Sequence, residues 1–386
     1  MPVYLDHAAT TPMVEACADA LVRQMRKLGN PSSLHSYGRA ARKELELARE
    51  VIAESVGCHF SEIIFTGSGT EANNSAIKGL FWRGRAQGRN VVVISAIEHH
   101  AILDSAHWLR EQEGAEVIEI GVTPAGLLDL NALIELLSSR ADEIAVISIM
   151  SANNETGVIQ PISEVVQLAN GANIPVHCDA VQSFAKVPIS FAQLGVTALT
   201  LSAHKIGGPL GIGILVLRKG FDIPALLHGG GQERDIRSGT LNAPSIVGFA
   251  AAVTEAFRTF EERNARVKEL RDRLIGGLTE EFSDAYINGI NAGRLPGIVN
   301  ATFPGTESET LLLLLDAEGI ACSTGSACSA GVQRPSHVLL AMGHTDVSAR
   351  SSLRFSIGST NTAEDIEQTI RALPSVITRA RAANLR

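Results

Sequence analysis

The stretch 174–209 reads IPVHCDAVQSFAKVPISFAQLGVTALTLSAHKIGGP and contains two short apolar runs, IPVHC and ALTLS. Both runs have the length and composition of buried strands. Polar residues come directly after each run: Asp179 after the first, and Ser202, His204 and Lys205 at the end of the second. This pattern predicts two strands of one sheet that deliver chemically active side chains to a common edge.

Five further runs of the same kind lie before or after this stretch: EIIFT (62–66), VVVIS (91–95), VIEI (117–120), IAVISIM (144–150) and GIGILVL (211–217). Helix-like segments separate most of them, which predicts an α/β domain with a largely parallel central sheet. Ligands collect at the carboxyl ends of strands in such sheets. We therefore expect Gly69, Thr70, His99 and Asn154 to lie near Asp179 and Lys205.

The remainder of the chain predicts a second, smaller domain. Residues 244–282 have helical spacing and mixed charge, as in a connecting helix. Beyond them, strand-like runs at 287–290, 297–303 and 352–358 mix with helix-like segments at 308–319 and 363–373. This mixture indicates an α+β unit.

Bulk composition narrows the class of protein. The 386 residues are 45% hydrophobic and carry a net charge of −8, which disfavours binding to nucleic acid or to an anionic membrane. No secretory signal or membrane-length apolar run is visible. The five cysteines include no C-x-x-C pair, which argues against a disulfide framework or structural zinc. We expect a soluble, cytoplasmic protein.

Lys205 and Asp179 are the candidates for chemistry on a bound cofactor. A lysine directly after a buried strand is unusual unless an amine is needed there. Burial can lower the pKa of the lysine towards neutrality, and the neutral amine is a nucleophile. Asp179 could hold a pyridine nitrogen protonated, and Gln182 lies one helical turn further along. Taken singly, Lys205 could be a surface lysine in a glycine-rich turn, and Asp179 could be a helix N-cap.

Two other motifs suit the same kind of ligand. GSGTEANN (67–74) opens a helix, so the backbone amides of Gly69 and Thr70 could bind a phosphate, although a plain loop with a cap is also compatible. His99 could stack on an aromatic ring or move protons. His99 and His100 are adjacent and lack a further ligand, so we expect no metal site.

Cys328 lies in CSTGSACSAGVQRPS (322–336), whose Ser, Gly and Ala content predicts a mobile loop. Such a loop could carry a thiol to and from a reaction centre. Cys17, Cys58, Cys178 and Cys322 lie in helix-like, strand-like or apolar contexts and are expected to be packing residues.

With these residues in place, the chain resembles the pyridoxal 5′-phosphate (PLP) dependent cysteine desulfurases of the NifS/IscS type, in the class V aminotransferase-like group. The resemblance covers nearly the whole chain, and its motifs occur in the family's order: YLDHAATTP (4–12), NPSSLHSYGR (30–39), FTGSGTEANN (65–74), NNETG (153–157), HCDAVQ (177–182), SAHKIGGPLGIG (202–213), HGGGQERDIRSGT (228–240), STGSACSAG (323–331) and LRFSIG (353–358).

The resemblance implies a fold type I homodimer, with a large PLP domain over 14–255 and a small domain over 1–13 and 256–386. Residue by residue, the resemblance implies that Lys205 binds the cofactor covalently, that Asp179 contacts the pyridinium and that His99 stacks on the ring. It implies that Asn154 and Gln182 contact the phenolic oxygen, and that Thr70, Ser202 and His204 bind the phosphate together with the amide of Gly69 proposed above, while Thr240 binds the phosphate of the neighbouring subunit. Arg354 and Asn154 match residues that bind the substrate, and Cys328 matches the residue that accepts sulfur as a persulfide. For the mechanism, our hypothesis is that Lys205 acts as general base and that His99 transfers a proton at the substrate thiol.

The implied activity converts L-cysteine to L-alanine and passes sulfur to an acceptor such as an iron–sulfur scaffold protein, for cluster assembly or for thiolation of cofactors or transfer RNA. Ser68 replaces a glycine that many relatives carry, and the chain lacks the longer tail that some relatives use to dock a scaffold. Three alternatives stay open: a selenocysteine lyase, a class V aminotransferase, and a catalytically idle docking platform for iron–sulfur assembly proteins.

Overall fold

All seven runs predicted between residues 62 and 217 form strands of one sheet in the computed structural model, which describes residues 2–325 and 334–384. The sheet order is β2-β8-β7-β6-β5-β3-β4. Its strands are β2 (Ile63–Thr66), β3 (Val91–Ser95), β4 (Glu116–Ile120), β5 (Ile144–Ser148), β6 (Val176–Asp179), β7 (Ala198–Ser202) and β8 (Gly213–Leu217). The strands from β7 through β4 are parallel, and β8 alone runs antiparallel to both of its neighbours.

A close backbone contact explains the glycine that begins β8. A Cβ atom added to Gly213 would lie 2.4 Å from the carbonyl carbon of Ser68, in the loop after β2. Only glycine therefore allows β8 to pass beside this loop. The contact fixes the loop that precedes helix α3 (Gly69–Arg85), which packs against β5, β7 and β8.

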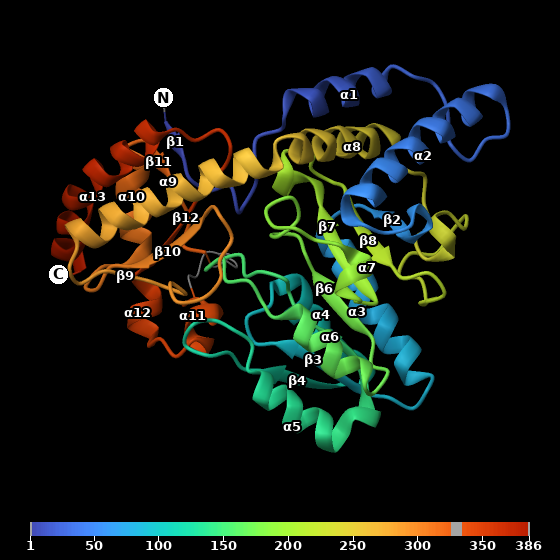
Figure 1. The fold of residues 1–386 in the computed structure, drawn as a ribbon, viewed down its shortest axis with the longest axis horizontal. Coiled ribbons are helices and arrows are strands. Elements are labelled where there is room, and N and C mark those ends of the chain that lie inside the picture. The colour runs from blue at the N-terminus through green and yellow to red at the C-terminus, as the bar shows by residue number, and fades with distance from the viewer. Residues whose placement is uncertain (1, 326–333, 385–386) are drawn as a thin grey trace.

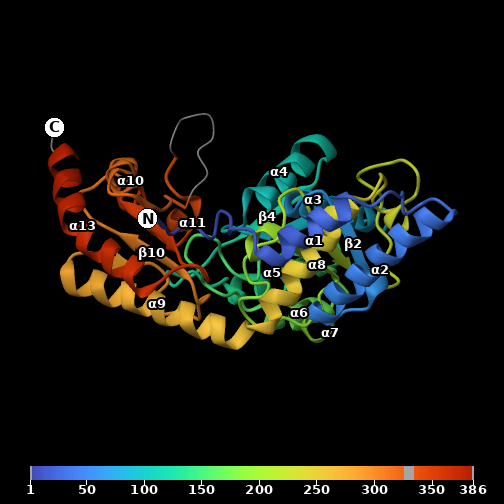
Figure 2. The same cartoon turned by 90° about the horizontal axis from the view of Figure 1, so that it is seen from above.

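Helices cover the sheet and extend from it. Figures 1 and 2 show α1 (Glu15–Met25), α2 (Ser36–Val56) and α8 (Ala243–Arg258) grouped at one end, where α8 packs against both α1 and α2. The other helices of this part are α4 (His100–Glu113), α5 (Leu130–Arg140), α6 (Ile162–Asn170) and α7 (Phe191–Leu194). None of the helices in the described ranges has the length and apolar character that a membrane span requires.

A second hydrophobic core lies beside the core that surrounds the large sheet (Figure 1). Its three-stranded sheet has the order β12-β10-β9, built from β9 (Tyr286–Ile287), β10 (Ile298–Thr302) and β12 (Ser352–Ser356). Helices α9 (Phe260–Glu281), α10 (Ser308–Ala317), α11 (His337–Ala341), α12 (Asp346–Arg350) and α13 (Ala363–Asn384) accompany it. The N-terminal strand β1 (Val3–Tyr4) pairs with β11 (Ile320–Ala321), so the beginning of the chain belongs to this core.

The single connecting helix predicted over 244–282 is two helices, α8 and α9. Thr259 separates them with backbone angles of φ −115° and ψ 21°, outside the helical range. Its hydroxyl donates to the carbonyl of Glu255 at 3.4 Å, which provides a local alternative to the helical hydrogen bond. Residue periodicity did not reveal this break because apolar spacing continues on both sides.

A buried ion pair fixes the edge of the large sheet. Arg49 donates from Nη1 and Nη2 to the two carboxylate oxygens of Glu233, at 2.9 and 2.7 Å. The same carboxylate accepts from the backbone amide of Phe65 at 2.7 Å, and Arg49 also donates to the carbonyl of Ile63. Glu233 has a positive φ of 44°, and so do the next two residues, so this pair holds a strained turn against β2.

We expect Arg49→Ala to lower the free energy of unfolding by about 3–5 kcal/mol, because it leaves the buried Glu233 carboxylate without its partner. Denaturant unfolding followed by circular dichroism measures the change. Glu46→Ala is the matched control, since Glu46 contacts Arg49 from the more exposed side, and it should cost about 1 kcal/mol or less. Equal losses in the two variants would contradict the role given to the buried pair.

Candidate active site

A cavity of about 510 Å³ opens at the carboxyl ends of the parallel strands, as the sequence predicted. The predicted residues that line it are Gly69, Thr70, His99, Asn154, Asp179, Gln182, Ser202, His204, Lys205 and Arg354. These residues come from positions 69 to 354 of the chain and from both cores. The lining of the cavity is therefore complete only when the two cores are packed against each other.

Lys205 lies in a short 3₁₀ segment, Ala203–Ile206, directly after β7. Its ammonium donates to the backbone carbonyls of Ala8 and Ala9, at 2.6 and 2.8 Å. Burial, followed by the positive charge of Arg354, lowers the pKa of Lys205 to about 8. A substantial fraction of this amine is neutral near physiological pH, which is the state that a nucleophile or base requires.

Asp179 ends β6 and is buried, with 6% of its surface exposed. One carboxylate oxygen accepts from Nδ2 of Asn73 at 2.7 Å, and the other accepts from the backbone amide of Val181 at 2.9 Å. The second contact means that Asp179 also caps the turn after the strand, so this residue combines a cap with a place in the cavity. Two donors hold the carboxylate at the floor of the cavity.

The opposite part of the cavity is suited to an anion. Helix α3 begins at Gly69, and the hydroxyl of Ser68 caps it by accepting from the amide of Glu71 at 3.0 Å. The side chain of Ser68 thus serves as the cap of this helix. This leaves the first amides of the helix directed at the cavity, where the positive end of the helix dipole favours a phosphate.

His204 and Ser202 lie beside this helix start. Nδ1 of His204 is 3.2 Å from the hydroxyl of Thr10, and burial lowers the pKa of His204 to about 4. Its ring is neutral at physiological pH and offers a hydrogen bond rather than a charge. Ser202 is buried and adds a hydroxyl to the same wall.

His99 is the N-cap of helix α4, and its Nδ1 accepts from the backbone amide of Ala101 at 3.1 Å. In the neutral ring the proton is therefore on Nε2. Burial lowers the pKa of His99, which favours this neutral form. The adjacent His100 is exposed and lies 3.2 Å from Asp104, outside the cavity, and the described residues contain no cluster of His, Cys, Asp and Glu able to hold a metal ion.

Arg354 in β12 is buried, with 4% of its surface exposed, and its guanidinium is already engaged. Nη2 donates to Oδ1 of Asp6 at 2.7 Å, and Nη1 donates to the carbonyl of Asn154 at 3.0 Å. Nε is buried and has no acceptor in the described chain. A carboxylate that approaches Arg354 must share the guanidinium with Asp6 or replace it.

Gln182 connects this cavity to Ala8 in the N-terminal segment and to Lys186. Its Nε2 donates to the carbonyl of Ala8 at 2.9 Å, and its Oε1 accepts from Nζ of Lys186 at 3.2 Å. Because a backbone carbonyl can only accept, the contact with Ala8 fixes which end of the Gln182 amide carries the nitrogen.

Thr240 is the one predicted residue within the described ranges that does not line this cavity. It is exposed, which is compatible with the prediction that Thr240 serves a neighbouring subunit. Cys328 lies outside the described residues. The four described cysteines are poor nucleophiles, because burial raises the pKa of Cys17 to about 11 and of Cys58 and Cys322 to about 12, and it also holds the pKa of Cys178 well above the ordinary value.

Sequence reasoning gave no role to Asn73, Asp6 or the carbonyls of Ala8 and Ala9. Asn73 lies one turn into α3 from Gly69, so helical spacing alone could have placed it on the cavity side. Asp6, Ala8 and Ala9 belong to the motif YLDHAATTP, yet their partners are about 200 to 350 residues away in the chain. No local pattern gives such pairings.

The cavity fits a phosphorylated aromatic aldehyde such as PLP. It contains an amine of lowered pKa, a buried carboxylate that two donors hold, and a helix N-terminus for an anion. Oδ1 of Asn73 is buried without a partner among the described residues, next to the carboxylate. Gly69 is closely packed against the site, since a Cβ there would lie 3.1 Å from the side chain of Val181 and 3.3 Å from that of Ser202.

Comparison with known proteins gives a consistent result. The Aminotransferase class-V family matches residues 3–369. An IscS-like cysteine desulfurase of Mycobacterium tuberculosis is 48% identical over 385 residues, covering 99% of this chain and 98% of that protein. The cysteine desulfurase IscS of Dictyoglomus turgidum is 43% identical over 380 residues, covering 98% and 95%.

Solved structures agree with the sequence relatives. A NifS-like protein has a TM-score of 0.90 at 35% identity, covering 98% of this chain and 100% of that one. A NifS-like protein from Rickettsia africae has a TM-score of 0.88 at 34% identity, with the same coverage. The predicted fold, a large domain with a mostly parallel mixed sheet and a smaller α+β part, is confirmed.

We expect acylation of Lys205 in the cofactor-free protein to increase as pH rises through about 8, because only the neutral amine reacts. Arg354→Gln should move this midpoint upward, since the charge of Arg354 lowers the pKa of Lys205. Peptide mass spectrometry after brief acylation measures the midpoint. Arg379→Gln, at an exposed site on α13, is the control, and a midpoint near the ordinary lysine value in the unmodified chain would refute the assignment.

Proposed function

This chain belongs to the aminotransferase class-V family, and from that premise we propose that it is a PLP-dependent cysteine desulfurase that converts L-cysteine to L-alanine. Relatives with this name match it over nearly its full length. The observation that carries the proposal is one cavity that holds Lys205, Asp179 and Arg354, in which the lysine has a pKa of about 8. The proposal includes a role for each residue of this cavity.

The chain's own groups suit the parts of the cofactor. Lys205 would hold it covalently, and Asp179 would keep its ring nitrogen protonated. His99 would stack on the ring, with Asn154 and Gln182 at the phenolic oxygen. The phosphate would be bound by Gly69, Thr70, Ser202 and His204, and by Thr240 of the neighbouring subunit. When bound, PLP supplies an electron sink for bonds at the substrate's α-carbon.

Binding and proton transfer depend on the same geometry. Arg354, with Asn154 beside it, would take the substrate carboxylate in exchange for part of its contact with Asp6. Lys205, once displaced by the substrate amine, would remove the α-proton, because its lowered pKa makes the neutral amine available. His99 carries its proton on Nε2 and would exchange a proton with the substrate thiol.

Cys328 would receive the sulfur. Its thiolate would attack the substrate sulfur, so that an S–S bond forms while the C–S bond breaks. The electron pair of the C–S bond stays with carbon, which gains a proton and leaves as part of alanine. The high pKa values of the four described cysteines support this assignment, since thiolate is the reactive form.

The proposal also covers assembly and location. The division into 14–255 and 1–13 with 256–386 is supported by the separate core that includes Val3 and Leu5. Met25 at the end of α1 and Leu28 and Leu34 in the segment before α2 are 65%, 79% and 87% exposed, which supports a homodimer contact there. We place the protein in the cytoplasm, where an iron–sulfur scaffold protein would be a suitable sulfur acceptor.

Cys328→Ser should keep the visible cofactor absorbance and lose sulfide release from L-cysteine by a factor on the order of a thousand or more, since it removes the nucleophile. Mass spectrometry of the unmodified protein after cysteine treatment should find one added sulfur atom on the peptide containing Cys328. Cys322→Ser is the matched control and should retain activity. Normal turnover in Cys328→Ser would exclude the persulfide role and favour another activity of the same fold.

Lys205→Ala should abolish both the visible band and turnover, because no other described lysine lines this cavity. Borohydride reduction of the purified protein, followed by peptide mapping, should attach a phosphopyridoxyl group to Lys205. A label on another lysine, with Lys205 unmodified, would overturn the assignment of the cofactor site.

A further inference from the structure

A second cavity, of about 500 Å³, lies on the far side of Lys186 from the active site, and we call it the outer basic cavity. It lies between helix α9 and the loop before β10. Its described lining consists of Lys186, Asn264, Ala265, Lys268, Arg271, Ile290, Ala292, Arg294 and Pro296. Four of these side chains are cationic and none is a carboxylate. Such an excess of one charge beside a hollow surface favours an anionic ligand.

Arg294 is the first observation that points to a ligand. Its Nη1 is buried and has no acceptor within the described parts of the chain. Burial, then the neighbouring charge of Arg271, lowers the pKa of Arg294. Its backbone is fixed, because residue 294 forms a β-bridge with Val158 and Gly293 accepts from the amide of Ile159 at 2.9 Å. The backbone that carries this side chain is thus held in place, and the guanidinium has a buried donor without an acceptor, which is costly unless an acceptor arrives.

The other arginine of the cavity is fully used and provides a contrast. Arg271 donates to Asp272 at 2.6 and 2.9 Å and to the carbonyl of Leu295 at 2.9 Å. The second oxygen of Asp272 accepts from Lys268 at 2.9 Å. The single nearby carboxylate therefore serves Arg271 and Lys268, and it leaves Arg294 and Lys186 for a ligand.

Lys186 is the second observation. Within the described chain its ammonium donates to the neutral Oε1 of Gln182, at 3.2 Å. Burial and the charges of Lys205, Arg263 and Arg354 lower the pKa of Lys186 to about 7, and no carboxylate contributes. The preceding Ala185 has a positive φ of 56°, and its carbonyl accepts from the side chains of Arg263 and Asn264. This strained turn is stabilised in the position that places Lys186 at the cavity wall.

From these contacts we propose that the outer basic cavity binds a compact polyanion, a small molecule with phosphoryl or several carboxylate groups. The guanidinium of Arg294 would donate to one anionic group, and Lys186 would pair with another. Lys268 lies at the same wall and adds positive charge. The volume of about 500 Å³ suits a small metabolite rather than a macromolecular segment.

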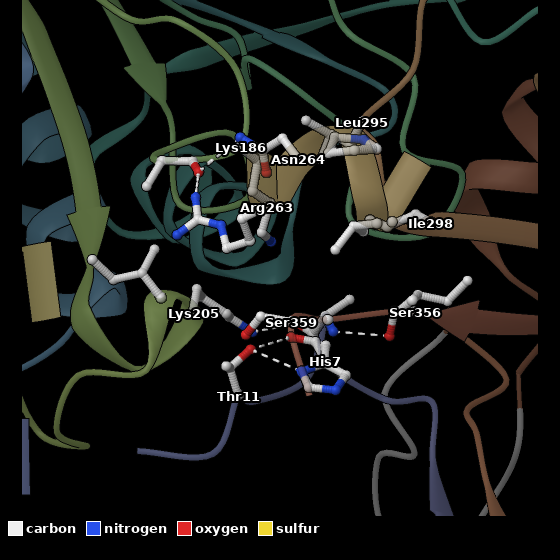
Figure 3. Close-up of a pocket in the computed structure, with 18 residues that line it drawn as sticks. His7, Thr11, Lys186, Lys205, Arg263, Asn264, Leu295, Ile298, Ser356 and Ser359 are labelled. Carbon is white, nitrogen blue, oxygen red and sulfur yellow. Dashed lines mark hydrogen bonds between the residues drawn. The ribbon is translucent and has the colours of Figure 1, made fainter. Parts of the chain in front are cut away.

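Lys186 also connects this ligand to the active site. It lines a smaller cavity of about 70 Å³ behind Lys205, where Lys186 and Arg263 lie across from Lys205 and His7 (Figure 3). Lys186 donates to Gln182, Gln182 donates to the carbonyl of Ala8, and Lys205 donates to the same carbonyl. A bound anion would keep Lys186 charged and hold Gln182 in this orientation, and its negative charge would favour the protonated form of groups at Lys205.

The test uses the purified holoprotein and rests on the proposed function, in which the cofactor phosphate already fills the site at the start of helix α3. Isothermal calorimetry with inorganic pyrophosphate, at constant ionic strength in chloride, should give one site per chain. Arg294→Gln and Lys186→Met should each weaken binding about tenfold or more, because each removes one charged donor. Arg110→Gln, at an exposed position on α4, should bind as the unmodified chain does.

Citrate replaces pyrophosphate in a parallel titration, and the tighter of the two ligands assigns phosphoryl or carboxylate chemistry. In a second measurement, pyrophosphate should raise the pH midpoint of the visible cofactor band in the unmodified holoprotein and leave it unchanged in Lys186→Met. Melting temperatures within the range of the control establish that the variants are folded. Equal affinities in Arg294→Gln, Lys186→Met and Arg110→Gln, or no binding of either anion, would overturn the proposal.

Discussion

The hydrogen bonds from Lys205 to the carbonyls of Ala8 and Ala9 are the contact on which the site depends. They join the residue after β7 of the large sheet to a segment that packs with the smaller core. The same segment supplies Asp6 to Arg354 and the carbonyl of Ala8 to Gln182. Groups from both cores are therefore held at fixed positions around one ammonium, and the cavity exists only because the N-terminal segment crosses between the cores.

The central sheet and half of the site were predictable from local patterns, and the rest depends on contacts between distant residues. Strand-length apolar runs placed Asp179 and Lys205 at the carboxyl ends of β6 and β7, because the loops after parallel strands emerge at one edge of the sheet. Asn73 reaches Asp179 across 106 residues, and Asp6 reaches Arg354 across 348. Sequence spacing contains no information about such pairs without the fold.

Short-range physics explains the other differences. The break between α8 and α9 is local to the backbone of Thr259, with φ −115° and ψ 21°, and apolar periodicity does not register it. The use of Ser68 as a helix cap is a consequence of its position, although the sequence alone left its effect on the loop uncertain. The predicted role of Cys328 concerns a residue outside the described ranges and stays a prediction from its motif and from the unreactive character of the other cysteines.

The pairing of Asp6 with Arg354 has an effect on selectivity. An amino acid that enters the site gains only the difference between two ion pairs, because an internal carboxylate already neutralises the guanidinium. Under the proposed role of Arg354, acetate, succinate and similar metabolites would compete poorly, as they offer little that Asp6 does not. Recognition would then depend on the amine and the side chain of the incoming molecule.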